Sequence, residues 1–470
     1  STSLMAADRP NILWITAEDH GPHLGCYGDA YATTPHLDAF AETALRYTRA
    51  ISNAPVCAPA RTTVISGMYP TATGSQHMRS RVPAPSWMRF FPAYLREAGY
   101  YTTNNAKEDY NLTGAEKGWD ESSGTAHWKN RPAGAPFFAV FNTNISHESR
   151  IRDENPNPLH DPAQAPVPPY HPDLPVVRKE WAQYYDRLTQ ADAFFAEHLA
   201  ELEEAGQAEE TIVFYWADHG SGMPRGKRYP GWSGLHVPLI IHFPDKWRHL
   251  APADYQPGGT SDRLVGFIDF APTLLSIAGV DIPGYYQGHA FAGRSPDPAE
   301  AYAFGFRGRM DERPDACRSV MDGRYVYIRN FYPHLPHGQY VTYQQRTRTT
   351  AEWFRLSQEG KLNAVQSRFW QPHPREELFD LETDPHETRN LAGSARHQAV
   401  LKLMRGALDA HLVRTRDLGF LPEPILERLV EDGQSPAEAL KPRLEATPNL
   451  GLEVLAERQG QAAILAGLRD

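Results

Sequence analysis

The sequence has 470 residues, of which 22% are charged and 11% aromatic, and its formal net charge is −10 at pH 7. This length allows one large domain and a smaller one, and no apolar run approaches the ~20 residues that a membrane-spanning helix needs. The negative charge argues against a nucleic-acid partner, because the long-range field would repel a polyanion. An anionic substrate would therefore have to be held by local cations.

The cysteine content excludes a disulfide framework, since the chain holds only Cys26, Cys57 and Cys317. Three thiols leave the compartment undecided, because an exported enzyme need not contain disulfides. A periplasmic or exported location is nevertheless our expectation. No apolar signal-peptide core follows Ser1 in the printed sequence.

Four apolar runs are each followed by polar residues that can carry chemistry. The runs are 12–16 before Glu18 and Asp19, 100–103 before Lys107 and Asp109, 137–141 before His147, and 212–216 before Asp218 and His219. Short apolar runs rich in β-forming residues are typical of buried strands. Ligands of open α/β sheets bind beyond the carboxyl ends of the strands. We therefore expect the four runs to direct these side chains into one crevice.

Helical patterns separate these runs, which indicates an α/β layered fold. One helix is predicted after Thr34-Pro35, and a long amphipathic helix over 181–205 ends at Gly206. The proline-rich stretch 155–175 predicts an irregular surface excursion. Towards the C-terminus the patterns predict strands over 321–331 and 377–381, a helix over 399–412, and at least three short helices over 425–470.

The pentapeptide Cys57-Ala58-Pro59-Ala60-Arg61 is the most informative local motif. Pro59 suits the first turn of a helix, where its missing N–H costs nothing, and residues 62–68 can continue that helix. Cys57 would then lie at the helix N-terminus, where free N–H groups favour an anion. The alternative is a small buried cysteine in a turn.

The segment from Cys57 to Gly67 resembles the signature of the formylglycine-dependent sulfatases, which belong to the alkaline-phosphatase superfamily. Residues 10–19 resemble the family's first strand with its paired acids, and residues 378–391 resemble its C-terminal signature. Several segments resemble the heparan N-sulfatase-like bacterial branch. The resemblance implies a large mixed sheet flanked by helices and a smaller C-terminal α+β subdomain. We place the catalytic domain at 8–340, the subdomain at 341–424 and a helical extension at 425–470.

The resemblance implies that a maturation enzyme oxidises Cys57 to formylglycine, whose hydrate is the nucleophile. It also implies a metal site, for which we expect Glu18, Asp19, Asp218 and His219 together with residue 57. Carboxylate oxygens with one imidazole favour Ca²⁺, with Mg²⁺ or Mn²⁺ as alternatives. Glu18 replaces the commoner aspartate and adds a methylene while keeping the charge. The alternative for the first acid pair is a solvated loop or a helix cap.

The remaining assignments follow from the same resemblance. Arg61, Lys107 and Lys227 match cations that hold sulfate, and His147 matches a histidine beside the leaving group that could donate a proton. Asp109 departs from the family, because many sulfatases carry a second histidine there. Either Asp109 acts as a base, or another residue such as His77 or His236 enters the site. The residues that we predict to line a sugar pocket are His77, Arg79, Arg309, Asp311 and His334.

Together these features predict a sulfatase that hydrolyses a sulfate ester or sulfamate on a sulfated carbohydrate. One alternative is a phosphonate or phosphate mono- or diester hydrolase of the same superfamily. A non-catalytic protein that binds sulfated glycans is a second, and a hydrolase that uses the Cys57 thiol directly is a third.

Overall fold

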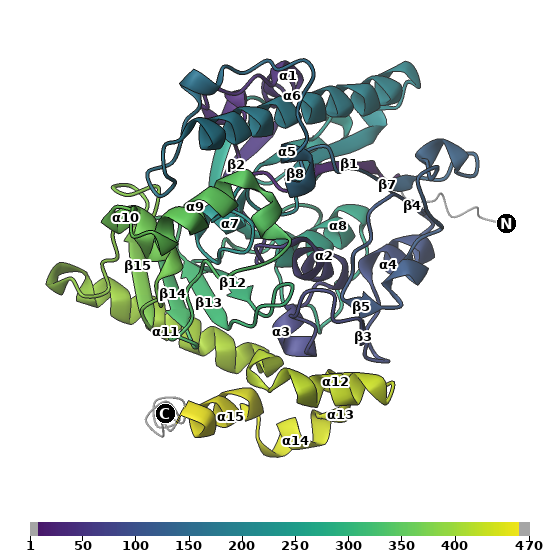
Figure 1. The fold of residues 1–470 in the computed structure, drawn as a ribbon. Helices are drawn as coiled ribbons and strands as arrows, with labels where there is room; N and C mark the ends of the chain where they lie inside the picture. Colours follow the sequence, from purple (N-terminus) through teal and green to yellow (C-terminus); the bar gives the residue numbers. More distant parts are fainter. Residues whose placement is uncertain (1–7, 460–470) are drawn as a thin grey trace.

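The computed structural model describes residues 8–459 and consists of a large sheet between two helical layers, a small sheet and a C-terminal group of helices (Figure 1). The nine strands of the large sheet are, in spatial order, β11 (Thr260–Gly266), β2 (Leu45–Ile51), β10 (Leu239–His242), β8 (Thr211–Ala217), β1 (Asn11–Ala17), β7 (Phe137–Thr143), β4 (Tyr101–Asn105) and β6 (Glu121–Ser122), with β9 (His236–Val237) paired to β2. The strand β10 runs antiparallel to both of its neighbours, so the sheet is mixed. The predicted fold class is confirmed.

The four apolar runs form the four adjacent strands β8, β1, β7 and β4, and each pair of neighbours among them is parallel. In this register Ala17, the last residue of β1, lies opposite Thr143 of β7 and Ala217 of β8. The residues that follow these strands therefore leave the sheet at the same edge. The predicted convergence of these residues at the carboxyl ends of the strands is confirmed at the level of the backbone.

Both faces of this central part of the sheet are covered by helices (Figure 1). Leu13 and Ile15 belong to a buried cluster with α1 (Pro35–Ala41) and α6 (Pro175–Glu204). Ile12 and Trp14 belong to another cluster with α2 (Cys57–Ser66), α4 (Phe91–Glu97) and α8 (Phe270–Ala278). Successive side chains of a strand point to opposite faces, so an uninterrupted apolar run can bury both. This layering fixes the edge where the site forms.

The long predicted helix is confirmed as α6, although it begins at Pro175 rather than at Trp181. Proline is favoured at the first helical position, so Pro175 starts the helix instead of delaying it. The stretch before it is irregular, as predicted, with a single 3-10 turn at Pro162–Gln164.

The small sheet is antiparallel and contains β12 (Ala303–Arg307), β13 (Cys317–Met321), β14 (Tyr325–Asn330) and β15 (Glu376–Asp380), with α11 (Gln398–Thr415) against it. The predicted strand over 321–331 is wrong at its start. Met321 ends β13, and a turn at Gly323 (φ 93°) reverses the chain before β14. The apolar alternation continues through this tight turn and so conceals it. Three of the four strands precede residue 341, and the division into domains at that residue stays a prediction.

The C-terminal residues form α12 (Glu423–Glu431), α13 (Pro436–Ala439), α14 (Lys441–Ala446) and α15 (Leu450–Gln459), which lie below the rest of the molecule in Figure 1. Leucines 418, 421, 426, 440 and 444 form their own small core. Glu423 accepts from Arg309 Nε at 2.6 Å, so the helices are tied to the loop after β12. Residues 460–470 of the predicted extension lie outside the described residues.

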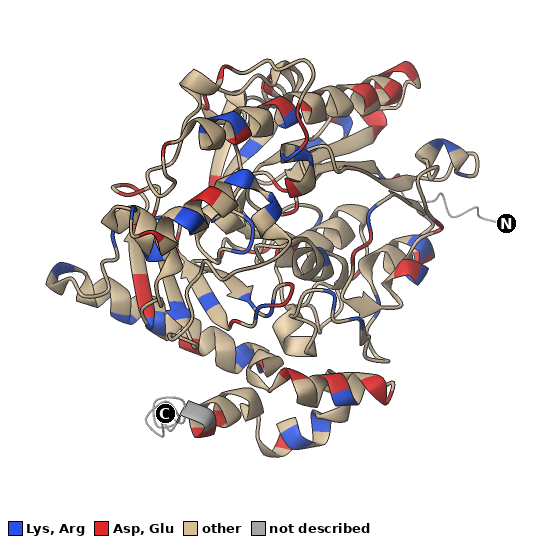
Figure 2. Cartoon of the chain, in the orientation of Figure 1, with Lys and Arg blue, Asp and Glu red and all other residues tan. Residues whose placement is uncertain are grey.

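Charges of both signs are spread over the molecule, and acidic residues gather at the C-terminal end of α6 (Figure 2). Among residues 8–459, no helix combines the length and the apolar character needed to cross a membrane.

Candidate active site

Cys57 is the first residue of α2, directly after the N-cap residue Val56, as the sequence predicted. Its side chain is almost fully buried. The Sγ atom lies 3.4 Å from Lys227 Nζ, 3.5 Å from His219 Nε2 and 3.9 Å from Asp19 Oδ1. A charged lysine, a histidine and a carboxylate, which the sequence separates widely, thus surround one thiol at a helix N-terminus.

Asp19 and Asp218 meet beyond the ends of β1 and β8. The backbone N–H of Asp19, a residue with φ 54°, donates to Asp218 Oδ1 at 3.0 Å. His219 Nε2 lies 3.0 Å from Asp19 Oδ1, and Arg61 Nη2 lies 3.1 Å from Asp218 Oδ2. Both carboxylates are fully buried, which is costly unless cations balance them.

These residues fit a divalent cation. Asp19, Cys57, Asp218 and His219 each offer a donor atom, and the four atoms lie within 4.8 Å of one another. Two buried carboxylates among them suit a hard cation such as Ca²⁺. Glu18 offers a donor atom in an overlapping group with Asp19, Cys57 and His147, and its two oxygens accept from Lys107 Nζ at 3.2 Å and from Asn142 Nδ2 at 3.0 Å.

The electrostatics of the site favour charged forms. Burial raises the pKa of Cys57, whereas Lys227 and a hydrogen bond with His147 lower it, and the net shift is downward. Burial lowers the pKa of His219, but Asp218 and Asp19 raise it to about 10. Burial lowers the pKa of His147, but Asp19 and Cys57 together raise it above its ordinary value. His147 Nε2 lies 3.3 Å from Lys227 Nζ, so the imidazole faces the same space as the thiol.

Lys107 and Asp109 lie beyond β4 on the other side of the crevice. Lys107 Nζ is 3.5 Å from Asp109 Oδ2, and Arg79 Nε is 3.4 Å from Asp109 Oδ1. Burial raises the pKa of Asp109, but Lys107, Arg79 and Arg61 together lower it by more, so the net shift is downward. At this position the chain therefore carries a carboxylate between cations. The ring of the alternative residue His236 faces the Thr48 carbonyl at 2.9 Å instead.

The predicted sugar-pocket residues have different surroundings. Asp311 Oδ2 accepts from Arg228 Nε at 2.9 Å, and Arg79 is exposed beside Asp109. His77 accepts from the Arg309 backbone N–H at 2.9 Å, and burial lowers its pKa to about 3. His334 is exposed on the connection after β14. Their part in sugar binding stays a prediction.

Three residues of the site were not assigned by the sequence. Glu148 begins the short helix α5 (Glu148–Ile151), and its carboxylate accepts from both Nη atoms of Arg228 at 3.0 Å. Lys227 Nζ lies 3.3 Å from the same carboxylate. Asn142 Oδ1 accepts from Arg61 Nη2 at 2.7 Å. Glu148 and Asn142 are close to His147 in the sequence, and this proximity could have indicated them as site residues. Nothing in the sequence distinguishes Arg228 from an arginine at the surface.

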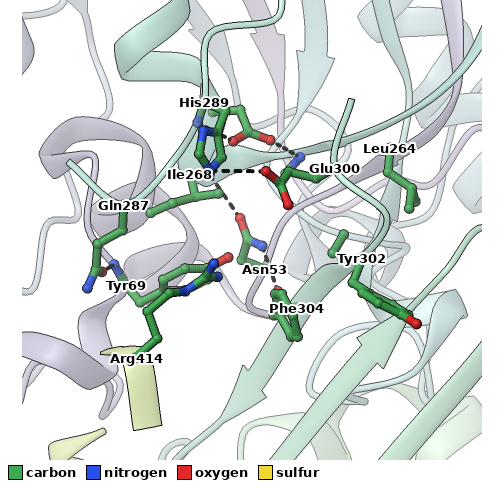
Figure 3. Close-up of a pocket in the computed structure, with 13 residues that line it drawn as sticks. Asn53, Tyr69, Leu264, Ile268, Gln287, His289, Glu300, Tyr302, Phe304 and Arg414 are labelled. Carbon is green, nitrogen blue, oxygen red and sulfur yellow. Dashed lines mark hydrogen bonds and ion pairs between the residues drawn. The ribbon is translucent and has the colours of Figure 1, made fainter. Parts of the chain in front are cut away.

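A separate pocket lies among β11, β12 and α11 (Figure 3), and none of the predicted site residues line it. Asn53 Nδ2 donates to the Phe304 carbonyl at 2.6 Å, and Asn53 Oδ1 accepts from the Ile268 N–H at 3.0 Å. His289 Nε2 lies 3.2 Å from Glu300. These polar groups pair with one another, so the crevice around Cys57 remains the candidate active site.

Comparisons of the sequence and the fold relate the chain to known hydrolases. The sulfatase family model matches residues 10–131 and 104–280. An ulvan-active sulfatase of Formosa agariphila is 36% identical, in an alignment covering 93% of this chain and 80% of that protein. Human N-sulphoglucosamine sulphohydrolase is 26% identical, in an alignment covering 87% of this chain and 93% of that protein. The solved phosphonate monoester hydrolase of Silicibacter pomeroyi shares the fold, with a TM-score of 0.64 at 19% identity, and 88% and 97% of the two chains are covered.

Proposed function

Because this chain belongs to the sulfatase family, whose members hydrolyse sulfate esters or sulfamates, we propose that its substrates are sulfated carbohydrates. The observation that carries the proposal is the set of cations and buried carboxylates around Cys57. Lys227 Nζ lies 3.4 Å from the thiol, and Arg61 pairs with Asp218 beside it. Fixed charges of this kind can hold a sulfate group and stabilise the charge that develops on its oxygens.

We infer that Cys57 is converted to formylglycine by a maturation enzyme, and that Asp19, Asp218 and His219 hold a calcium ion. The aldehyde, when formed, would supply the hydrated nucleophile, and the ion would supply Lewis-acid polarisation of the sulfate. Mg²⁺ or Mn²⁺ could take the same ligands. In support, Cys57 lies within reach of the ligand group, at 3.9 Å from Asp19 Oδ1.

The chain's own residues would bind the sulfate and move the proton. Arg61, Lys107 and Lys227 are the cations of the site, and their amino or guanidinium groups would donate to sulfate oxygens. His147, whose pKa is raised above its ordinary value, can give a proton from Nε2 to the departing oxygen or nitrogen. Asp109, whose Oδ2 lies 3.5 Å from Lys107 Nζ, would hold that lysine in place or act as a base.

The carbohydrate substrate is supported by the relatives. The 36% identical protein is active on ulvan, and the human relative is named for N-sulphoglucosamine, so both act on carbohydrates. The phosphonate hydrolase shares only the fold at 19% identity, which makes phosphonate esters the weaker alternative. A proton donor at His147 is compatible with cleavage of either the S–O bond or the S–N bond.

The test is a comparison of kcat/KM across substrates for enzyme produced with a formylglycine-generating enzyme. The panel holds sulfated ulvan oligosaccharides, N- and O-sulfated glucosamines, an aryl sulfate and an aryl phosphonate. We expect release of sulfate from a saccharide with a higher kcat/KM than from the aryl sulfate. Activity confined to the aryl or phosphonate ester would contradict the proposal.

Two cysteine variants form the matched control. Cys57→Ser should lose turnover in a host that does not oxidise serine, whereas Cys26→Ser, which lies outside the crevice, should keep it. Peptide mass spectrometry of the active enzyme should show the mass decrease expected when the Cys57 thiol side chain becomes an aldehyde. Full activity with an unmodified Cys57 would exclude the aldehyde and favour direct attack by the thiol.

A further inference from the structure

A second group of metal-binding side chains lies in the small sheet, outside the active site. Asp315, Cys317, His337 and His373 each offer one donor atom, and the four atoms lie within 4.8 Å of one another. All four side chains are buried. None of them is among the residues around Cys57, and the three segments that supply them are far apart in the sequence.

The hydrogen bonding inside this group is incomplete. Both ring nitrogens of His373 are buried without a hydrogen-bond partner, although the side chain is only 3% exposed. Its Nε2 lies 3.7 Å from Asp315 Oδ1, which is beyond hydrogen-bond distance. His337 Nδ1 and Asp315 Oδ2 are also unpartnered. Buried polar atoms without partners are costly, and several converging on one point indicate a ligand.

The surroundings of His337 match those of a metal ligand. Its Nε2 lies 2.8 Å from Glu377 Oε2, and the same carboxylate oxygen accepts from Asn330 Nδ2 at 2.8 Å. Paired in this way, Nε2 carries the proton, and the free Nδ1 presents its lone pair to the group. A histidine that binds a metal commonly donates its other ring N–H to a carboxylate, which fixes the orientation of the ring.

We propose that Asp315, Cys317, His337 and His373 bind a zinc ion that joins the small sheet to its two long connections. Four ligands of mixed sulfur, nitrogen and oxygen character are typical of structural zinc sites, whereas the hard active-site group suits calcium. Binding releases the Cys317 thiol proton, so the thiolate and the Asp315 carboxylate balance the two charges of the ion. Donors about 2.0–2.3 Å from zinc stand about 3.3–3.8 Å apart, so the group has to contract by about 1 Å.

The position of the site gives the ion a structural role. Cys317 starts β13, while His337 and His373 follow Pro336 and Pro372, which pair across two otherwise irregular segments. One ion would hold all three segments together. The His337 ring also lies 5.1 Å from the Tyr229 ring, close to the loop that carries Lys227. Loss of the ion should therefore lower stability first and activity second.

The alternative is that no metal binds and that Arg307, whose Nε lies 3.5 Å from Asp315 Oδ2, neutralises the charge of the Asp315 carboxylate. Elemental analysis of the protein prepared with calcium and zinc separates the two. We expect about one zinc per chain in the wild type, and near zero in Cys317→Ser and His373→Gln. The controls Cys57→Ser and His249→Gln, an exposed histidine, should keep the zinc. A wild type with no zinc, or variants that retain it, would overturn the proposal.

A spectroscopic measurement avoids dependence on ligand variants that fail to fold. The chain has three cysteines, so in Cys26→Ser/Cys57→Ser only Cys317 can supply a thiolate. Cobalt substituted into this double variant should give the near-ultraviolet thiolate-to-cobalt band, and zinc should remove it. If the double variant binds no cobalt or shows no such band, the site does not exist. Sulfatase activity of Cys26→Ser, measured separately, keeps this outcome distinct from a failure of the proposed function.

Discussion

His147 is the side chain whose protonation decides how the leaving group departs. Burial lowers the pKa of His147, but the Asp19 carboxylate, 4.0 Å from Nε2, and Cys57 together raise it above its ordinary value. The proton is therefore present below the raised pKa and lost as the pH rises through it. Without it, an alkoxide or amide would have to leave unprotonated, which is slow for a sugar and tolerable for an aryl group.

We expect His147→Gln to lower kcat on a sulfated saccharide by about 10²–10⁴-fold and to affect an aryl sulfate much less. The wild-type rate should fall as pH rises through the raised pKa of His147, and this limb should be missing in the variant. Steady-state pH profiles on both substrates test this. His127→Gln, a histidine paired with Glu201, is the control. Equal losses on both substrates would exclude His147 as the proton donor.

Arg228 and Glu148 form a buried ion pair, and the Glu148 carboxylate also contacts Lys227. Both Nη atoms of Arg228 donate to the carboxylate, and its side chain is 6% exposed. We expect Arg228→Met to lower the free energy of unfolding by about 3 kcal/mol, because it leaves a buried carboxylate short of one partner. Denaturant midpoints measure the effect. In Arg324→Met, where the arginine is 43% exposed beside Asp380, the change should stay below about 1 kcal/mol.

At the scale of elements, the site depends on how closely the loop after β8 approaches the segment at 233–234. Gly220 follows His219, and its N–H donates to the Gly234 carbonyl at 2.9 Å. A Cβ at Gly220 would run into the Ser233 carbonyl oxygen, which is backbone and cannot swing away. Glycine therefore permits the approach that positions His219.

We expect Gly220→Ala to displace His219, weaken calcium binding and lower activity at saturating substrate. Calcium titration followed by isothermal calorimetry tests the binding directly. Gly124→Ala is the matched control, because Gly124 is exposed and a Cβ there meets nothing within 4 Å. Unchanged calcium affinity in Gly220→Ala would mean that His219 is not a ligand, or that the loop relaxes without cost.

The sequence predicted the elements that carry the site better than those that surround it. Four apolar runs were sufficient to place β8, β1, β7 and β4 and the polar residues after them, since buried parallel strands have a distinct composition. The hairpin of β13 and β14 was missed, because apolar alternation does not break at a tight turn. The Glu148–Arg228 pair was missed as well, since a charged residue that is buried by a distant partner looks like any surface charge.

At the scale of the whole molecule, the C-terminal segment is attached to the large sheet through buried charge. Arg225 Nη2 donates to the Glu387 carbonyl at 2.9 Å, and Glu387 Oε1 accepts from the Trp232 N–H at 2.8 Å. The other carboxylate oxygen, Oε2, is buried without a hydrogen-bond partner. The segment that resembles the family's C-terminal signature thus closes over the loop between β8 and β9, which also carries Lys227.

Glu387 should make this attachment sensitive to pH. Burial raises the pKa of Glu387 from 4.5 to about 7, and Arg225 offsets only part of the effect. Between these values the folded protein holds a proton that the unfolded chain has lost, so stability falls as pH rises through the window. The loss is about 3 kcal/mol when the window has been crossed. Below pH 4.5 both states are protonated and the effect vanishes.

We therefore expect Glu387→Gln, which keeps an acceptor for the Trp232 N–H, to be more stable than the wild type at pH 7 and nearly equal to it near pH 4.5. The difference in unfolding free energy should grow steadily between these two values and then level off. Denaturant unfolding at a series of pH values measures it. Glu382→Gln, whose side chain is 63% exposed, is the control and should show no such trend. A constant difference across the window would mean that Glu387 stays ionised in the fold, and that Arg225 alone balances the charge that attaches the C-terminal segment.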